Sequence, residues 1–346
     1  TTPSIEPSIR KPGVFSVLSI PEFRWLFVGN VAFFFAMQGQ ILTRSILAWD
    51  LTGSAQSLAY INLVVAVPMM FASMIGGAIT DRVERRQLVI VGQCLITGNE
   101  IFILILLLLG QLEFWHLLCT AFIAGCAFPF IMPARMAITI NVVGHERIQS
   151  AMAISGGAMN LSRVAGPAMA GIIIAQFSIV AAYIVSTLLY GAAVICMLFV
   201  KRNIAIQPEG GKQPLLADIV YGFQYIKVNK PVMVCLLFGL APMFLAMPFQ
   251  SLLVMLVEQS WQTGETGIGI LMGAGGVGGV LGSIWIARRG DKSERLQLMC
   301  VTVIGFAVLL GVFTQTSIFY LALLPLALAN LCASAFQTVN NATVQI

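Results

Sequence analysis

Stretches of about 20 residues without a charged side chain recur along this sequence, and each is long enough to cross a bilayer as a helix. One of them runs from Thr266 to Ala287 and reads TGIGILMGAGGVGGVLGSIWIA. Only 10% of all residues are charged, whereas a soluble domain carries about 25%. The chain is therefore predicted to be an all-α integral membrane protein.

Ten such spans can be placed, at roughly residues 24–48, 58–80, 88–110, 114–136, 149–175, 178–200, 231–257, 266–287, 296–314 and 317–346. The expected domains are an N-terminal six-helix half at 1–200, a cytoplasmic linker with an amphipathic helix at 201–230, and a C-terminal half with four helices at 231–346. If the two halves match in size, two further helices are expected after the last residue shown.

Basic residues alternate between the connections. The N-terminal segment and the connections after the second, fourth, sixth and eighth spans contain Lys and Arg. None occurs in the other connections, near residues 50–57, 111–114, 176–178, 258–265 and 314–317. By the positive-inside rule, the N-terminus and the basic connections are expected to be cytoplasmic, in a bacterial inner membrane.

Residues 273–278 read GAGGVG and fit the dinucleotide-binding pattern G-x-G-x-x-G. That pattern binds a pyrophosphate only where a strand leads into a helix, and no strand-like segment precedes it here. Its glycines are instead expected to form small-residue faces for close helix packing, through Gly269, Gly273, Gly276 and Gly279 or Gly282. A membrane oxidoreductase is the enzyme alternative, but no nucleotide, metal or redox ligand is predicted.

Two similar loops indicate an internal repeat. Span two ends in GGAITDRVERRQL and span eight ends in LGSIWIARRGDKSERLQL. Each combines a glycine-bearing helix end, a short charged loop and a new helix that starts with Gln-Leu. Parallel six-helix repeats of this kind are a transporter architecture.

The first loop resembles the signature of the major facilitator superfamily, G-x-x-x-D-R-x-G-R-R. Gly77, Asp81, Arg82, Arg85 and Arg86 match it, and Glu84 replaces the second glycine. The glutamate, together with AWDLTGS, MPAR and NLSRVAGPAMAG, resembles the branch of drug and siderophore exporters that look like the enterobactin exporter.

The resemblance implies a secondary transporter with two six-helix halves that rock about a central cavity. It implies a proton-coupled exporter of a small amphipathic molecule, drug-like or siderophore-like, with the proton gradient in place of a cofactor. The expected partners are the substrate and the lipid bilayer, without nucleic acid or nucleotide, and the expected state is a monomer. An uptake transporter, a lysolipid flippase and a non-transporting scaffold or receptor are the alternatives.

The inner loop has a physical role of its own in this scheme. Gly77 is expected to let two helices approach closely, and Asp81 can accept charge-assisted hydrogen bonds that latch the cytoplasmic gate. Arg135, at the inner end of span four, is expected to pair with Asp81 or Glu84.

Span five contains Arg163, Gly166, Pro167 and Gly171, and its Gly-Pro-x-x-x-Gly pattern resembles an element associated with antiporters. Pro167 and Gly166 can bend the helix. The alternative is a kinked helix that serves packing only.

Ionisable residues inside spans are costly and mark functional sites. Arg163 is expected to face a cavity or a partner. Glu100 is a candidate for carrying the coupled proton, and Arg44 and Asp50 are further candidates, although Arg44 could also snorkel to the surface.

Polar and aromatic residues on three spans predict a cavity for an amphipathic solute. Hydrogen bonding between helices is the alternative for each of them. The candidates are Asn30, Phe34, Gln38, Gln40, Phe238, Phe249, Gln250, Asn330 and Gln337.

Overall fold

The computed structural model describes residues 14–80, 83–144, 147–201, 255–261, 263–289 and 295–344, together with positions 233 and 253. Helices make up nearly all of these ranges, and no strand occurs in them. Nine of the described helices are long and apolar enough to cross a membrane. The prediction of an all-α membrane protein is therefore confirmed.

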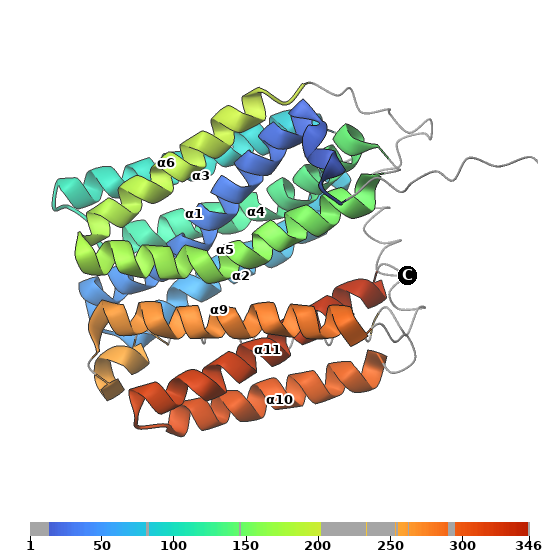
Figure 1. The fold of residues 1–346 in the computed structure, drawn as a ribbon. Coiled ribbons are helices and arrows are strands. Elements are labelled where there is room, and N and C mark those ends of the chain that lie inside the picture. Colours follow the sequence, from blue (N-terminus) through green and yellow to red (C-terminus); the bar gives the residue numbers. More distant parts are fainter. Residues whose placement is uncertain are drawn as a thin grey trace, which may run out of the picture.

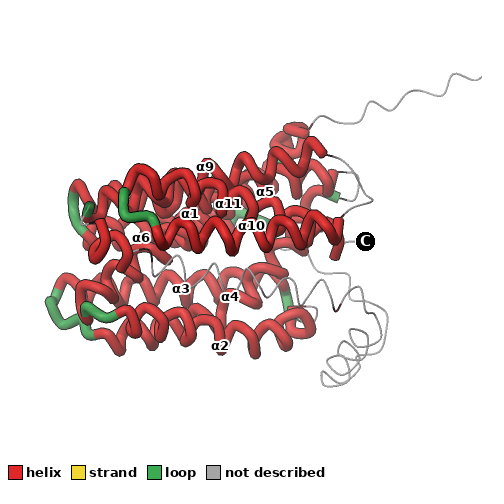
Figure 2. Tube along the Cα trace, turned by 90° about the horizontal axis from the view of Figure 1, so that it is seen from below, coloured by secondary structure: helices red, strands yellow, loops and turns green. Residues whose placement is uncertain are grey.

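The helices run side by side in one bundle, as Figures 1 and 2 show. The N-terminal half comprises η1 (Val14–Ser19), α1 (Pro21–Thr52), α2 (Ala55–Thr80), α3 (Arg85–Leu108), α4 (Phe114–Val143), α5 (Ile148–Gln176) and α6 (Ile179–Leu198). The C-terminal half comprises η3 (Val257–Trp261), α9 (Gly264–Arg289), α10 (Arg295–Gln315) and α11 (Phe319–Val344).

Nine predicted spans correspond to these long helices. Of these, α1, α2 and α4 extend several residues beyond the predicted ends, and the others begin and end within about three residues of them. The seventh span, 231–257, and the amphipathic linker helix lie almost entirely outside the described residues. The division at residues 200 and 230 therefore stays a prediction.

Local signals in the sequence fix several helix ends. Gly53 ends α1 in the left-handed conformation, with φ 59°, and its amide bonds to the Trp49 carbonyl; glycine adopts this conformation without steric cost. Ser178 begins α6 by accepting a hydrogen bond from the Ala181 amide. Glu113 and His116 form a reciprocal capping box at the start of α4. These caps satisfy backbone groups that a helix end leaves without partners.

The bundle has two chemically different ends. Arg24, Arg85, Arg86, Arg147 and Lys201 all lie at the ends where α1, α3 and α5 begin and α6 finishes. This end, called the basic end below, is on the right in Figure 1. It is the end predicted to be cytoplasmic.

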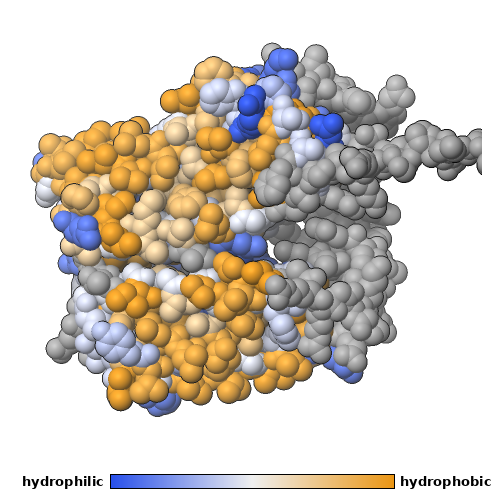
Figure 3. Space-filling view, in the orientation of Figure 1, coloured by the Kyte–Doolittle hydropathy of each residue, from blue (hydrophilic) through white to orange (hydrophobic). Residues whose placement is uncertain are grey.

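The outer surface between the two ends is apolar. Phe71, Leu188 and Val301 each expose more than half of their surface, and orange covers most of the flank in Figure 3. In a soluble protein such a surface would be an aggregation liability. Here it is the surface that lipid chains cover.

The pairing of helices in one half recurs in the other. In the first half α2 and α3 both pack on α4, and in the second half α9 and α10 both pack on α11. A Cβ atom at Gly76 of α2 would lie 2.9 Å from the Pro129 carbonyl oxygen of α4, and one at Gly282 of α9 would collide with the Leu331 carbonyl of α11. This common packing supports the predicted repeat.

The prediction of close packing through the glycines of this span holds in part. The predicted Gly282 faces α11, together with Gly275 and Gly278, and added Cβ atoms there would meet Leu331, Asn330 and Ala327. The predicted Gly269 lies against Gly171 of α5, whereas Gly273 borders open space. The glycines therefore serve contacts with two helices, and the positions of α5 and α11 decide which of them are covered.

Gly278→Ala is expected to lower the melting temperature of the purified protein in detergent, because the added methyl meets the Ala327 backbone. Overpacking of this kind costs about 1–3 kcal/mol. Gly311→Ala in α10 is the matched control, since its Cβ would lie in open space and alanine favours the helix. Equal melting temperatures for the two variants would contradict close packing at Gly278.

Candidate functional site

The two halves meet through apolar side chains near the end opposite to the basic end. Leu42 and Ile46 of α1 pack with Ile268 and Leu271 of α9 in one buried set. This set, called the interface cluster below, is Leu42, Ile46, Ile174, Ala182, Leu253, Val257, Ile268, Leu271, Phe313, Ala322 and Leu326. In the part of the chain that is described, the other buried clusters nearer the basic end each belong to one half.

Glycines bring α5 and α9 together at the same level. A Cβ atom on Gly171 would lie 3.3 Å from the Gly269 Cα atom. Further toward the basic end, Gly273 borders open space, and the two helices draw apart in Figure 1. The described halves are therefore closed at the opposite end and separate toward the basic end.

An ion pair lies inside the N-terminal half. The Arg44 Nη2 atom of α1 is 3.7 Å from Glu100 Oε1 of α3. The Ser186 hydroxyl of α6 lies 3.3 Å from Glu100 Oε2 and 3.0 Å from the Tyr183 carbonyl oxygen, and it can donate its one proton to either. The Glu100 side chain is 2% exposed and that of Arg44 is 12% exposed. A buried charge of either sign would be costly alone, so each residue makes the other tolerable here.

Further polar groups surround this pair. Gln40 and Arg44 lie beside the Tyr183 hydroxyl, yet neither the Gln40 amide nor that hydroxyl makes a hydrogen bond of good geometry. Gln93, two helical turns before Glu100, is fully buried and also lacks a partner. Such incompletely satisfied groups are places where a proton or a water molecule can be accommodated.

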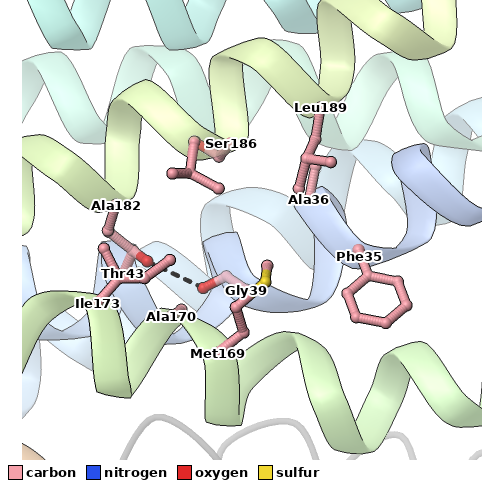
Figure 4. A pocket seen from close by; sticks show the side chains of 11 residues that line it. Phe35, Ala36, Gly39, Thr43, Met169, Ala170, Ile173, Ala182, Ser186 and Leu189 are labelled. Atoms are coloured by element: carbon pink, nitrogen blue, oxygen red, sulfur yellow. Dashed lines mark hydrogen bonds between the residues drawn. The ribbon is translucent and has the colours of Figure 1, made fainter.

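A narrow crevice is lined by Ser186, which also lies beside the ion pair. The crevice lies between α1, α5 and α6, and Figure 4 shows Ser186 and Ala182 on one wall, with Gly39, Thr43 and Ala170 opposite. The Thr43 hydroxyl donates to the Gly39 carbonyl of its own helix at 3.0 Å. Ser186 thus connects the crevice to the buried carboxyl.

Arg135 of α4 is buried in a separate environment. Its Nη1 atom donates to Asn30 Oδ1 at 2.5 Å, and its guanidinium lies 4.1 Å from the centre of the Phe33 ring. Arg135 is therefore held by Asn30 and Phe33 and not by Glu84, and its pairing with Asp81, which lies outside the described residues, stays a prediction. An aromatic face and an amide oxygen stabilise the cation here, although its Nε atom makes no hydrogen bond.

Arg163 lies midway along α5, on the side that faces the C-terminal half. Its Nη1 atom donates to Gln337 Oε1 of α11 at 2.8 Å, and both side chains are solvent-accessible. In Figure 3, hydrophilic colours interrupt the orange surface along the line where the halves meet. Arg163 therefore faces a partner across the space between the halves, as predicted.

The inner-loop motif is only partly described. The Arg86 Nη2 atom donates to the Leu198 carbonyl at 2.9 Å, which ties the start of α3 to the last turn of α6. Glu84 and Arg85 also have partners. Gly77 lies in the last turns of α2, and its packing, like Asp81 and Arg82, is outside the description. The latch assigned to Asp81 stays a prediction.

Span five behaves differently from a hinge in this structure, since α5 continues through Pro167 as one helix. Gly166 serves a close approach, because its Cβ would lie 2.9 Å from the Gln38 Cβ atom of α1. Asp50, at the end of α1, is exposed and has a partner.

The predicted cavity residues do not gather at one place. Asn30, Phe34, Gln38 and Gln40 are buried within the N-terminal half. Asn330 donates to the Leu326 carbonyl of its own helix, and Gln337 alone of the described candidates reaches across the halves. The remaining candidates, Phe238, Phe249 and Gln250, lie outside the described residues.

Ser186, Tyr183 and Gln93 were missed by the sequence analysis. Tyr183, Ser186 and Tyr190 share one face of α6 at spacings of three and four residues, in an otherwise apolar helix. That spacing was the available signal.

The fold and these buried charges define a class of protein: a helical membrane transporter built from two repeated halves. A family model described as transmembrane secretion effector matches residues 12–346. The chain therefore belongs to this family of the major facilitator superfamily, and it is not an enzyme.

Relatives and solved structures agree with this assignment. The chain is 20% identical to macrolide efflux protein A of Streptococcus pyogenes over 85% of its own length and 73% of that protein. It is 23% identical to the enterobactin exporter EntS of Salmonella typhi over 75% of its own length. The chain spans 62% of the length of that exporter.

The crystal structure of nucleoside transporter NupG matches 93% of the chain and 81% of that protein with a TM-score of 0.68 and 12% identity. At this identity the likeness shows the fold alone.

Replacing one member of the ion pair is expected to cost about 3–5 kcal/mol of the free energy of unfolding, because the other charge stays buried without a partner. Glu100→Met alone should therefore lower stability strongly, whereas Arg44→Met with Glu100→Met should recover most of the loss. Unfolding of the purified variants in detergent, arranged as a double-mutant cycle, measures this coupling. If the stability losses of the two single variants simply add in the double variant, the interaction between Arg44 and Glu100 is contradicted.

Proposed function

We propose that this chain forms the transporting part of a proton-driven exporter that moves a small amphipathic organic molecule by alternating access. The observation that carries the proposal is the buried Arg44–Glu100 pair, whose acid lies beside Ser186 at the wall of a crevice. The efflux proteins among its relatives support the direction of transport.

The ion pair offers a way to couple a proton to packing. When Glu100 takes up a proton, it no longer attracts Arg44, and the guanidinium must find other acceptors or water. The Ser186 hydroxyl, which can donate to the charged carboxylate or to the Tyr183 carbonyl, would bond less strongly to the neutral acid. Protonation thus weakens the side-chain contacts that join α3 to α1 and α3 to α6.

The same segment of α1 helps to hold the two halves together. Leu42 and Ile46 flank Arg44 and belong to the interface cluster. A change in how Arg44 is held therefore acts on a helix that contributes to closure at the end opposite to the basic end. This is the two-state element that a coupling mechanism needs.

Protonation of Glu100 is expected to be required for uphill export. In an efflux-deficient host, cells that contain the full-length protein should expel a dye or siderophore, and a protonophore should abolish this. Glu100→Gln, which removes the titratable proton, should abolish uphill efflux but retain downhill exchange of the same dye in vesicles. The measurement is dye fluorescence against time, normalised to the amount of folded protein in the membrane.

The matched control is Glu22→Gln, the same substitution at a partly exposed pair with Lys201, which should export normally because surface ion pairs contribute little. Uphill efflux that persists in Glu100→Gln would remove this residue from coupling. A well-folded wild-type protein that exports nothing would favour uptake, lipid transport or a scaffold.

Alternating access requires the Gly171–Gly269 contact to open. Cysteines at both positions, with the native cysteines replaced, are expected to form a disulfide under oxidant because the backbones nearly touch. The disulfide should stop transport, and a reducing agent should restore it. Cysteines at Gly171 and at Gly311, which borders open space on α10, are the control and should leave transport insensitive to oxidant. Continued transport by the cross-linked protein would mean that this contact is not a gate.

A further inference from the structure

Arg163 is the accessible cation among the deep charges of the described spans. Arg44 is paired with Glu100, and Arg135 is enclosed by Asn30 and Phe33. Arg163 instead projects between the halves, and its described partner is the neutral amide of Gln337. An uncompensated cation at this depth is costly unless water or an anion reaches it.

The opposing half supplies no counter-ion in the sequence given. The spans at 231–257, 266–287, 296–314 and 317–346 contain no Asp or Glu. This includes the seventh span, which lies mostly outside the described residues. No acid of these spans therefore balances Arg163, and water or an anion bound between the halves is left to meet its charge.

The geometry leaves Arg163 ready for such a ligand. A guanidinium has five N–H donors in a planar fork, and the bond to Gln337 uses one of them. The remaining donors match the paired oxygens of a carboxylate or a phosphate, which arginine binds in a bidentate manner. Gln337 can keep its bond and hold the guanidinium in place. Gly273, on the facing helix α9, borders open space.

We infer that Arg163, positioned by Gln337, binds an oxyanion, so that the substrate of the proposed exporter is an organic acid or an amphiphile with a phosphate group. That the bound oxyanion is a transported substrate rests on the proposed function. The oxyanion site at Arg163 does not itself require transport. A cationic substrate would meet a positive charge at Arg163 and no described acid to offset it.

The test is equilibrium binding to the purified full-length protein in phosphatidylcholine nanodiscs, without a proton gradient. The probes are fluorescein, an anion, and rhodamine 123, a cation built on a similar ring system. Fluorescein should bind more tightly than rhodamine 123, and Arg163→Gln should weaken fluorescein binding by about tenfold or more. Arg163→Lys should recover only part of the affinity, because it keeps the charge and loses the fork.

Two further variants keep the result interpretable. Gln337→Glu provides an internal counter-ion without removing Arg163, and it should also weaken fluorescein binding. Arg24→Gln, at an exposed position near the start of α1, removes the same charge elsewhere and should change nothing. Fluorescein binding that is equal in wild type, Arg163→Gln and Gln337→Glu would overturn the inference, even if the wild type exports dyes. Conversely, Arg163-dependent binding would stand if no export were found.

The source of the oxyanion can be separated in the same format. Phosphatidylglycerol is added to the nanodiscs. If it displaces fluorescein from wild type, the site takes a lipid phosphate. If it does not, the site takes a soluble acid.

Discussion

A charged side chain inside a bilayer has to find a partner or water, and this requirement organises the N-terminal half of the protein. Arg44, Glu100 and Arg135 could each destabilise a lone helix by several kcal/mol. In the structure α1 packs on α4, α5 and α6. Its Arg44 side chain reaches Glu100 of α3, which also lies near Ser186 of α6, while Arg135 of α4 meets Asn30 and Phe33 of α1. The polar contacts therefore fix the register of four helices at once, where apolar packing alone would tolerate sliding.

In the C-terminal half, close approach of helix backbones at glycines sets the register that buried charges set in the N-terminal half. The spans of the C-terminal half contain no charged pair to set their register, and lipid chains are as apolar as leucine. Gly275, Gly278 and Gly282 let the backbone of α9 lie directly on that of α11, which gains dispersion contacts over a long seam. Buried polar contacts thus hold the N-terminal half together, and close backbone packing at glycines holds the C-terminal half together.

The spans could be predicted from sequence because a run of about 20 apolar residues is a local property. The partners could not, because each depends on the rotation of separate helices. Arg44 and Glu100 were both candidates for coupling, but nothing local links α1 to α3, and Ser186 on α6 was not noticed. The Asn30 partner of Arg135 was missed for the same reason, since a partner was sought in the inner loop and not on α1. Gly275 and Gly278 were missed as packing residues because the positions of α5 and α11 decide which glycines of α9 are covered.

The position of Arg163 follows from how the two halves differ. The N-terminal half neutralises its deep charges internally, except for the one that projects outward from α5 toward a half whose spans, in the sequence given, contain no Asp or Glu. The Gly171–Gly269 contact closes the space on one side of Arg163, and Gln337 bridges it at the level of the guanidinium. In the proposed rocking motion the Arg163–Gln337 bond joins the two moving halves, so the distance between these side chains, and the support that Gln337 gives the guanidinium, changes with the state of the gate. Binding at Arg163 and the state of the gate are therefore physically linked through a single side-chain bond.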